Sequence, residues 1–331
     1  MSSVRRRDLS LQELEAGVRA RNPAILGRAI SLLESSTADD RRKAGELMLR
    51  LLPHARPAVR IGITGPPGVG KSTLIEALGT SLTAQGKRIA VLAVDPSSEF
   101  SGGSVLGDKT RMERLAADAK AFIRPTATHG VLGGVAARTG EAVALCESAG
   151  FDVVVVETVG VGQSETAVAD LTDVFVVLVE PGGGDELQGI KRGLMERADL
   201  IAITKADGNE AERARHTAHD YRMAMRLVRG NDHAPVVMAV SAQEGLGVRE
   251  LWQQMLSRRE MLNQTGQLDT RRRRERVRRF WAEIQQELRH HLENDAHIGA
   301  EVESTLREVE RGSLPPAVAA ERVLGGFFRR S

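Results

Sequence analysis

The sequence predicts a doubly wound α/β fold with a mostly parallel sheet, extended by helices on both sides. Short apolar runs recur through the middle of the chain, helical patterns separate them, and a glycine-rich turn joins the first run to the helix that follows. Runs such as Val153 to Val156 are apolar at every position, which is typical of strands buried on both faces of a parallel sheet.

Composition limits the possible function classes. The 331 residues include 46 basic and 44 acidic side chains, so the formal net charge is only +2 and does not indicate a nucleic-acid or membrane partner. Cys146 is the single cysteine, which excludes an internal disulfide or a metal site built from cysteines and fits a reducing compartment. The basic N-terminus leads into no apolar segment, and no apolar run approaches the roughly 18 residues of a membrane span. We therefore expect a cytoplasmic protein.

Residues 9–52 have helical periodicity and should form a cover on the α/β domain. The segment Arg21 to Pro23 predicts a turn within this block, and Thr37 resembles the capping residue of a further helix. Pro53 and Pro57 end the block.

The strands and helices of the central domain follow from the alternation of patterns. The predicted strands are 59–64, 88–94, 152–156, 173–179, 200–203 and 236–240. The predicted helices between them lie near 137–149, 187–197 and 210–228. Ligands of such sheets bind at the carboxyl ends of the strands, so residues that carry chemistry should follow the apolar runs directly.

The turn after the first run has the full spacing of a phosphate-binding loop. The predicted nucleotide contacts are Gly65, Pro66, Pro67, Gly68, Val69, Gly70, Lys71, Ser72 and Thr73. Glycines let backbone N–H groups approach phosphate oxygens, and the start of the following helix adds its positive dipole end. We expect Lys71 to place positive charge at the β- and γ-phosphates and Ser72 to offer its hydroxyl to Mg²⁺.

Two carboxylates after the second run are candidates for the catalytic metal and water. Asp95 follows Val94, and Asp108 lies in a long loop rich in glycine and serine. We interpret both as groups that hold Mg²⁺ through water or orient the attacking water. The alternative is that Asp95 belongs to a turn with Pro96 and that Asp108 caps a helix.

Glu157 ends a buried run three residues before Gly160. This spacing fits a carboxylate that contacts Mg²⁺ and a glycine N–H that meets the γ-phosphate. Glutamate replaces the usual aspartate, so we expect contact through a metal-bound water. A buried carboxylate without a partner would be costly, which argues against a purely structural role. Val161 stands where many small GTPases have a water-orienting glutamine, and this predicts slow hydrolysis.

The glycines from Gly182 to Gly184 follow the next run. They permit a loop that changes conformation with the nucleotide, or equally a plain flexible connection.

Two motifs at later strand ends predict specificity for guanine. Their residues are Thr204, Lys205, Asp207, Ser241, Ala242 and Gln243. Asp207 can accept hydrogen bonds from the guanine N1–H and amino group, and Lys205 would lie along the base. The second motif would meet the guanine oxygen through its backbone, and adenine would leave the carboxylate unpaired. Thr204 replaces the usual asparagine, and we expect a modest loss of affinity because a hydroxyl offers fewer hydrogen bonds.

The motifs together predict a P-loop G domain at residues 58–262 that binds GTP or GDP with Mg²⁺. A helical extension at residues 1–57 would precede it, and a helical dimerisation extension at residues 263–331 would follow. Seven of the nine residues from Arg271 to Arg279 are arginines, but interspersed glutamates favour a salt-bridged helix face over a nucleic-acid arm. Trp281, Ile284 and Leu288 predict an apolar stripe that packs on another helix or subunit.

These motifs resemble the MeaB/ArgK family of GTPases over the whole chain. The likeness rests on residues 65–73, 94–98, 107–112, 157–165 and 181–185. The resemblance implies a GTP-hydrolysing chaperone of adenosylcobalamin-dependent methylmalonyl-CoA mutase that protects the enzyme from inactivation and gates cofactor loading. It implies a homodimer joined through the C-terminal helices, with the adenosylcobalamin held by the partner enzyme.

Other functions stay open on the sequence alone. They are a nickel or cobalt metallochaperone GTPase, a kinase of a basic amino-acid transport system, a nucleic-acid-binding switch and a protein with an inactive nucleotide site. Nickel chaperones usually use Cys and His clusters, whereas Cys146 stands alone, and the nucleic-acid interpretation rests on the arginine run only.

Overall fold

The computed structural model describes residues 9–35, 37–95, 112–127, 132–158, 164–182, 192–230, 234–294 and 299–328. Contacts divide the chain into two compact units, residues 1–275 and 276–331, and each is described by itself. The three-part division at 57/58 and 262/263 remains a prediction.

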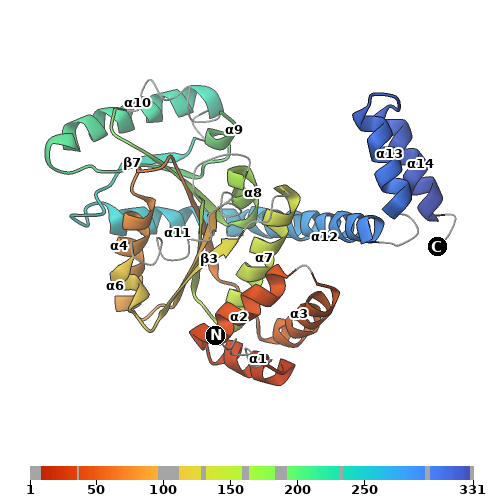
Figure 1. Ribbon diagram of the computed structural model, residues 1–331. Coiled ribbons are helices and arrows are strands. Elements are labelled where there is room, and N and C mark those ends of the chain that lie inside the picture. The colour runs from red at the N-terminus through yellow and green to blue at the C-terminus, as the bar shows by residue number, and fades with distance from the viewer. Residues whose placement is uncertain are drawn as a thin grey trace, which may run out of the picture. The chain divides into compact units, whose positions relative to one another are not determined.

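A seven-stranded sheet with the order β3-β2-β4-β1-β5-β6-β7 forms the centre of the first unit (Figure 1). Its strands are β1 (Val59–Thr64), β2 (Ile89–Asp95), β3 (Ala121–Ala127), β4 (Val153–Thr158), β5 (Val174–Val179), β6 (Leu200–Ile203) and β7 (Val236–Ala239). All neighbouring strands pair in parallel. The predicted α/β class is confirmed, and the sheet is wholly rather than mostly parallel.

Different helices cover the two faces of the sheet (Figure 1). One face carries α4 (Lys71–Ala84), α6 (Glu113–Ala116) and α11 (Val248–Gln264), and the other carries α7 (Leu132–Ala149), α8 (Ser164–Leu171), α9 (Arg192–Met195) and α10 (Ala211–Arg229). Val153 and Val155 join the core under α4 and α11, whereas Val154 and Val156 join the core under α7 and α8. Both faces of β4 are therefore buried, which explains its unbroken valine run.

The N-terminal helices pack on one another and on α7, outside one face of the sheet. They are α1 (Leu11–Arg19), α2 (Pro23–Glu34) and α3 (Ala38–Leu51), and η1 (Leu52–His54) follows them. Asn22 caps α2 by accepting the N–H groups of Ala24 and Ile25, and Thr37 caps α3 by accepting the N–H of Asp40. The predicted turn and cap are thus both present.

The sequence prediction omits β3, which lies at one edge of the sheet and pairs with β2. This strand contains Arg124 and Pro125, two residues that weaken an apolar strand pattern. Proline is tolerated at a sheet edge because no further strand needs its missing N–H. An edge position therefore explains both the composition of β3 and its absence from the prediction.

Two aspartates at the amino ends of β5 and β6 bind arginines from the helices that follow the sheet. We call this group the aspartate clamp, and it consists of Asp173, Asp199, Arg258, Arg259, Arg271 and Arg272. Both aspartate side chains are buried, and their distances to the arginine nitrogens range from 2.7 to 3.1 Å. The first two arginines of the arginine run therefore pair with the sheet, whereas the sequence predicted pairing along the helix face.

The second unit continues α12 (Gln267–Asn294) from Arg276 and contains α13 (Gly299–Glu310) and α14 (Pro316–Phe328), which pack on each other. Val277, Phe280, Trp281 and Leu288 of α12 are exposed in the single chain. They belong to the predicted apolar stripe or lie beside it.

Among the described residues, no helix has the length and apolar character needed to cross a membrane.

Candidate nucleotide-binding site

Most of the predicted site residues gather at one edge of the sheet, because β1, β4, β5 and β6 all end there. β1 lies between β4 and β5. The chain leaves it for β2 on one side and later crosses from β4 to β5 on the other side. Open α/β sheets bind ligands at such a switch point, outside the carboxyl ends of the strands.

The phosphate-loop sequence turns tightly between β1 and α4. A Cβ on Gly65 would lie 2.7 Å from the carbonyl oxygen of Leu178, so only glycine lets the loop pack this closely against β5. Gly70, which caps α4, lies in open space but has a φ of 95°, so here the backbone angle demands glycine. The loop thus leads directly into the N-terminus of a 14-residue helix, whose free N–H groups attract anions.

Lys71 is buried at the start of α4, and its ammonium group is held against the loop backbone. The Nζ atom donates to the carbonyl oxygens of Gly65 at 2.8 Å and Pro66 at 3.0 Å. Its side chain is mostly out of water, at 8% residue exposure. A cation in this position reinforces the preference of the helix N-terminus for an anion.

Ser72 and Glu157 bring two oxygen donors together next to the loop. The Ser72 hydroxyl donates to Glu157 Oε1 at 3.3 Å, and Glu157 is buried near the end of β4. The ends of β4 and β1 are also tied directly, because Thr158 Oγ1 donates to Thr64 Oγ1 at 2.7 Å. The carboxylate is therefore fixed beside the start of α4 by the pairing of its own strand.

This donor set fits Mg²⁺. Mg²⁺ prefers hard oxygen ligands and usually takes one or two carboxylates together with substrate phosphates and waters. Within the part of the chain that the structure describes, no group of three or more His, Cys, Asp or Glu side chains could hold a metal. Ser72 and Glu157 are thus suited to a metal that is shared with a phosphate substrate.

The two predicted base motifs lie together after β6 and β7. Ser241, which is buried, donates its hydroxyl to Asp207 Oδ2, and the Ala206 N–H donates to the Val240 carbonyl at 3.1 Å. The Ser241 hydroxyl also accepts the N–H of Glu244 at 3.1 Å. These contacts orient the Asp207 carboxylate. Ala242 is half-buried and Gln243 exposed in the same loop.

Lys205 has a partner that the sequence reasoning missed. Its Nζ lies 2.7 Å from Glu180 Oε1, and Glu180 directly follows β5 at the same edge of the sheet. Lys205 also has a φ of 53°, a left-handed backbone conformation that is uncommon for residues other than glycine. The position of Glu180 after a buried strand was the signal that could have found it.

Three predicted site residues cannot be placed fully. The backbone of Asp95 ends β2 at the same edge, but its side chain lies outside what the structure describes, as do Asp108 and Gly160 entirely. The glycine loop is described only as far as Gly182, so its switch role also remains a prediction.

Cys146 lies in α7, away from this edge of the sheet. Burial, with a further contribution from the charge of Glu147, raises the pKa of its thiol to about 12. The thiol therefore stays protonated at neutral pH and is not a reactive or metal-binding thiolate.

The sequence model of the family described as Methylmalonyl Co-A mutase-associated GTPase MeaB matches residues 26–297. The chain belongs to the MeaB family of GTPases. Membership of this family, with the P-loop GTPase fold, implies guanine nucleotide binding.

Relatives of this MeaB-family chain cover nearly its whole length. A Caulobacter vibrioides protein is 49% identical over 321 residues, which span 96% of this chain and 98% of the relative. The mouse protein named methylmalonic aciduria type A homolog, mitochondrial, is 44% identical over 93% of this chain and 77% of its own length. A solved structure titled LAO/AO transport system kinase has a TM-score of 0.71 and 34% identity, and it covers 97% of this chain and 98% of its own.

Proposed function

We propose that this MeaB-family protein binds GTP with Mg²⁺ and hydrolyses it, slowly alone and faster in complex with a protein partner. The observation that carries the proposal is the meeting of Lys71, Ser72 and Glu157 at the ends of β1 and β4. A buried cation, a hydroxyl and a carboxylate at a helix N-terminus are the groups that phosphoryl transfer requires.

Each group of site residues has its own role in GTP hydrolysis. Lys71 and the loop N–H groups bind the β- and γ-phosphates, and Ser72 and Glu157 would hold the metal, with Asp95 and Asp108 as further candidates. Bound Mg²⁺ would supply charge neutralisation at the β- and γ-oxygens. Phosphoryl transfer needs little covalent help, so positioning by these groups carries most of the catalysis. The Gly160 N–H is assigned to the γ-phosphate.

The guanine base is bound by the loops that follow β6 and β7. The residues assigned to it are Thr204, Lys205, Asp207, Ser241, Ala242 and Gln243. The hydrogen bond from Ser241 to Asp207 supports this assignment, because it orients the carboxylate that would read guanine.

We propose adenosylcobalamin-dependent methylmalonyl-CoA mutase as the partner. The family description and the name of the mouse relative support this choice. The chain would act as a cytoplasmic chaperone that guards the mutase and gates its cofactor loading, with adenosylcobalamin bound by the mutase. The exposed apolar residues around Trp281 support a homodimer through the C-terminal helices. Nucleotide state and partner state would then be coupled reciprocally.

Lys71→Ala tests the nucleotide site. Removing the buried ammonium should lower GTP affinity at least tenfold, as measured by titration with a fluorescent GTP analogue. Lys87→Ala, beyond the far end of α4, is the matched control and should bind as the unmodified protein does. Unchanged binding and turnover in Lys71→Ala would overturn the proposed site.

Turnover with and without the mutase tests the partner. GTP hydrolysis should accelerate when saturating mutase is added, and the mutase should be retained when the protein loaded with a non-hydrolysable GTP analogue is used to capture partners. Equal turnover with and without mutase contradicts the coupling.

The description of this solved relative as a transport system kinase motivates a second candidate function, that of a kinase. A kinase would transfer the γ-phosphate to a protein, whereas a GTPase releases it as inorganic phosphate. Incubation with GTP labelled at the γ-phosphate distinguishes them, and we expect the label to appear as free phosphate.

A further inference from the structure

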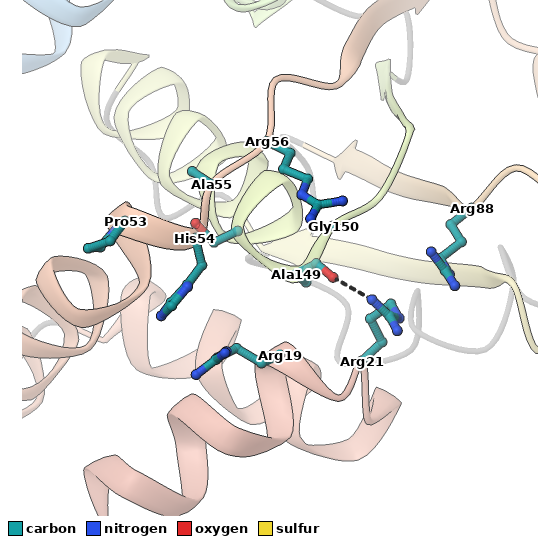
Figure 2. Close-up of a pocket in the computed structure, with 10 residues that line it drawn as sticks. Arg19, Arg21, Pro53, His54, Ala55, Arg56, Arg88, Ala149 and Gly150 are labelled. Carbon is teal, nitrogen blue, oxygen red and sulfur yellow. Dashed lines mark hydrogen bonds between the residues drawn. The ribbon is translucent and has the colours of Figure 1, made fainter.

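Figure 2 shows a hollow of about 490 Å³, and its lining residues place it at the edge of the sheet opposite the nucleotide site. Arg56 lies before β1 and Arg88 directly before β2, whereas the phosphate loop follows β1. We call this feature the arginine hollow, and its basic side chains are Arg19, Arg21, His54, Arg56 and Arg88. Its volume lies within the range of small-molecule sites.

The arginines come from separate parts of the chain and converge on the C-terminal end of α7. Figure 2 shows the side chains of Arg21, Arg56 and Arg88 grouped around Ala149 and Gly150, with Arg19 and His54 on the other side of the hollow. Such convergence is not a consequence of one charged helix face, because α1, the turn after it and the segments before β1 and β2 all contribute.

The positive charge of the hollow is poorly balanced by the protein. No aspartate or glutamate is among the residues that line it. Arg19 lies 3.8 Å from Glu15, but the guanidinium groups of Arg56 and Arg88 have no hydrogen-bond or ion-pair partner within the described residues.

The carboxylates nearby in the chain are already engaged. Glu147 binds Arg60 at 2.7 Å, and Asp152 accepts the backbone N–H of Arg88 at 2.7 Å. Like charges repel, so the guanidinium groups of Arg56 and Arg88, which have no partner within the described residues, favour an anionic ligand.

Helix capping explains only part of this cluster. Arg21 donates to the Ala149 carbonyl oxygen at 3.3 Å, and cations are favoured at the C-terminal ends of helices such as α1 and α7. Arg56 and Arg88 make no such contact with a helix carbonyl in the described residues. The positive charges of Arg56 and Arg88 are therefore available to bind a ligand.

We propose that the arginine hollow binds a small organic molecule that carries phosphate groups. The planar guanidinium group donates paired hydrogen bonds that match phosphate oxygens, and all four strong cations here are arginines. The hollow is also larger than one phosphate ion needs, and Pro53 and Ala55 give it an apolar wall for the body of the ligand.

Calorimetric titration of the full chain tests this site. Saturating Mg²⁺ and a non-hydrolysable GTP analogue first occupy the nucleotide site, and fructose 1,6-bisphosphate and inorganic phosphate then serve as probes. We expect one site that binds the bisphosphate at least tenfold more tightly than inorganic phosphate. Arg56→Ala and Arg88→Ala should each weaken the bisphosphate at least tenfold and leave binding of the GTP analogue unchanged.

Arg42→Ala is the matched control, because Arg42 is an exposed arginine of α3 whose partner, Asp39, is also exposed. Circular dichroism checks that each variant is folded. Arg56 and Arg88 are exposed, and their guanidinium groups have no partner among the residues that the structure describes, so folding should be retained. The proposal is overturned if the bisphosphate does not bind, if Arg42→Ala weakens it as much as Arg88→Ala does, or if citrate binds as tightly as the bisphosphate.

Discussion

The hydroxyl of Thr204 lies 2.7 Å from the carbonyl oxygen of Val69, and this hydrogen bond ties the loop after β6 to the glycine-rich loop between β1 and α4. The Val179 carbonyl oxygen lies 3.2 Å from the same hydroxyl, so one proton serves two buried acceptors. A carboxamide would bring two N–H donors to this place. The geometry gives a physical reason for the modest loss of affinity expected from threonine.

Thr204→Val keeps the side-chain shape but removes the donor. The Val69 carbonyl oxygen would lose this donor, whereas the Val179 carbonyl oxygen would keep the Thr204 backbone N–H at 2.9 Å. Leaving a buried acceptor unsatisfied costs about 1–3 kcal/mol. We expect GDP to bind about tenfold more weakly, measured by fluorescence titration, while Thr204→Asn binds at least as tightly as the unmodified protein. Equal affinity of Thr204→Val would mean that the tie does not support the nucleotide site.

Glu157→Gln tests the metal role of the carboxylate next to Ser72. The amide keeps the size of the side chain but removes the charge that would favour Mg²⁺. The Mg²⁺ concentration for half-maximal GTP turnover should rise at least tenfold, and GDP affinity without Mg²⁺ should change by less than twofold. Glu46→Gln, at an exposed position of α3, is the control. A Mg²⁺ dependence unchanged by Glu157→Gln would remove this residue from the metal site.

Asp207→Asn should change which base is bound. An asparagine can donate a hydrogen bond to the C2 oxygen of xanthine, whereas the aspartate accepts the hydrogen bonds of guanine. We expect GDP to lose at least tenfold in affinity and xanthosine diphosphate to gain relative to it in competition titrations. Parallel losses for both nucleotides would show that Asp207 supports the loop rather than reads the base.

Asp173→Asn should weaken the fold and change its acid sensitivity. Burial alone would raise the pKa of Asp173, but the hydrogen bonds and charge of Arg272, with those of Arg60, outweigh it and lower the pKa below its ordinary value. The unfolded chain therefore binds the proton first as the pH falls. This stabilisation is complete above an ordinary pKa of about 4 and is lost as the pH falls through the lower folded value.

Chemical denaturation at several pH values measures this effect. At pH 7 the substitution should cost about 3 kcal/mol, since it leaves arginines at a buried site without their anion. Between about pH 5 and 3, the interval in which a carboxyl group of the unfolded chain titrates, the free energy of unfolding should fall less steeply in Asp173→Asn than in the unmodified protein. Asp39→Asn, whose carboxylate is exposed, should follow the unmodified protein throughout.

Local patterns predicted what depends on neighbouring residues. The phosphate loop, the caps at Asn22 and Thr37 and the buried run of β4 are all set within a few residues, and the structure contains them. Contacts between distant residues have no such signal. Arg272 and Asp173 lie 99 positions apart, and the arginine run revealed an excess of charge without revealing its partner.

Glycine positions show the same limit. Gly62 reads as an ordinary member of β1, but a Cβ there would lie 2.7 Å from the ring of Phe175 and 2.9 Å from the Thr172 hydroxyl. Only the pairing of β1 with β5 makes glycine necessary, and that pairing joins residues 113 positions apart, counting from Gly62 to Phe175. Strand order, which the sequence does not state, was therefore the missing information.

The aspartate clamp has two arginines for each carboxylate, and this ratio should affect how related sequences diverge. Loss of one arginine leaves a second arginine bound to the same aspartate. Loss of Asp173 or Asp199 leaves both arginines of that aspartate without their anion. Among homologues, the basic positions should therefore drift one at a time, and the two acids should stay fixed.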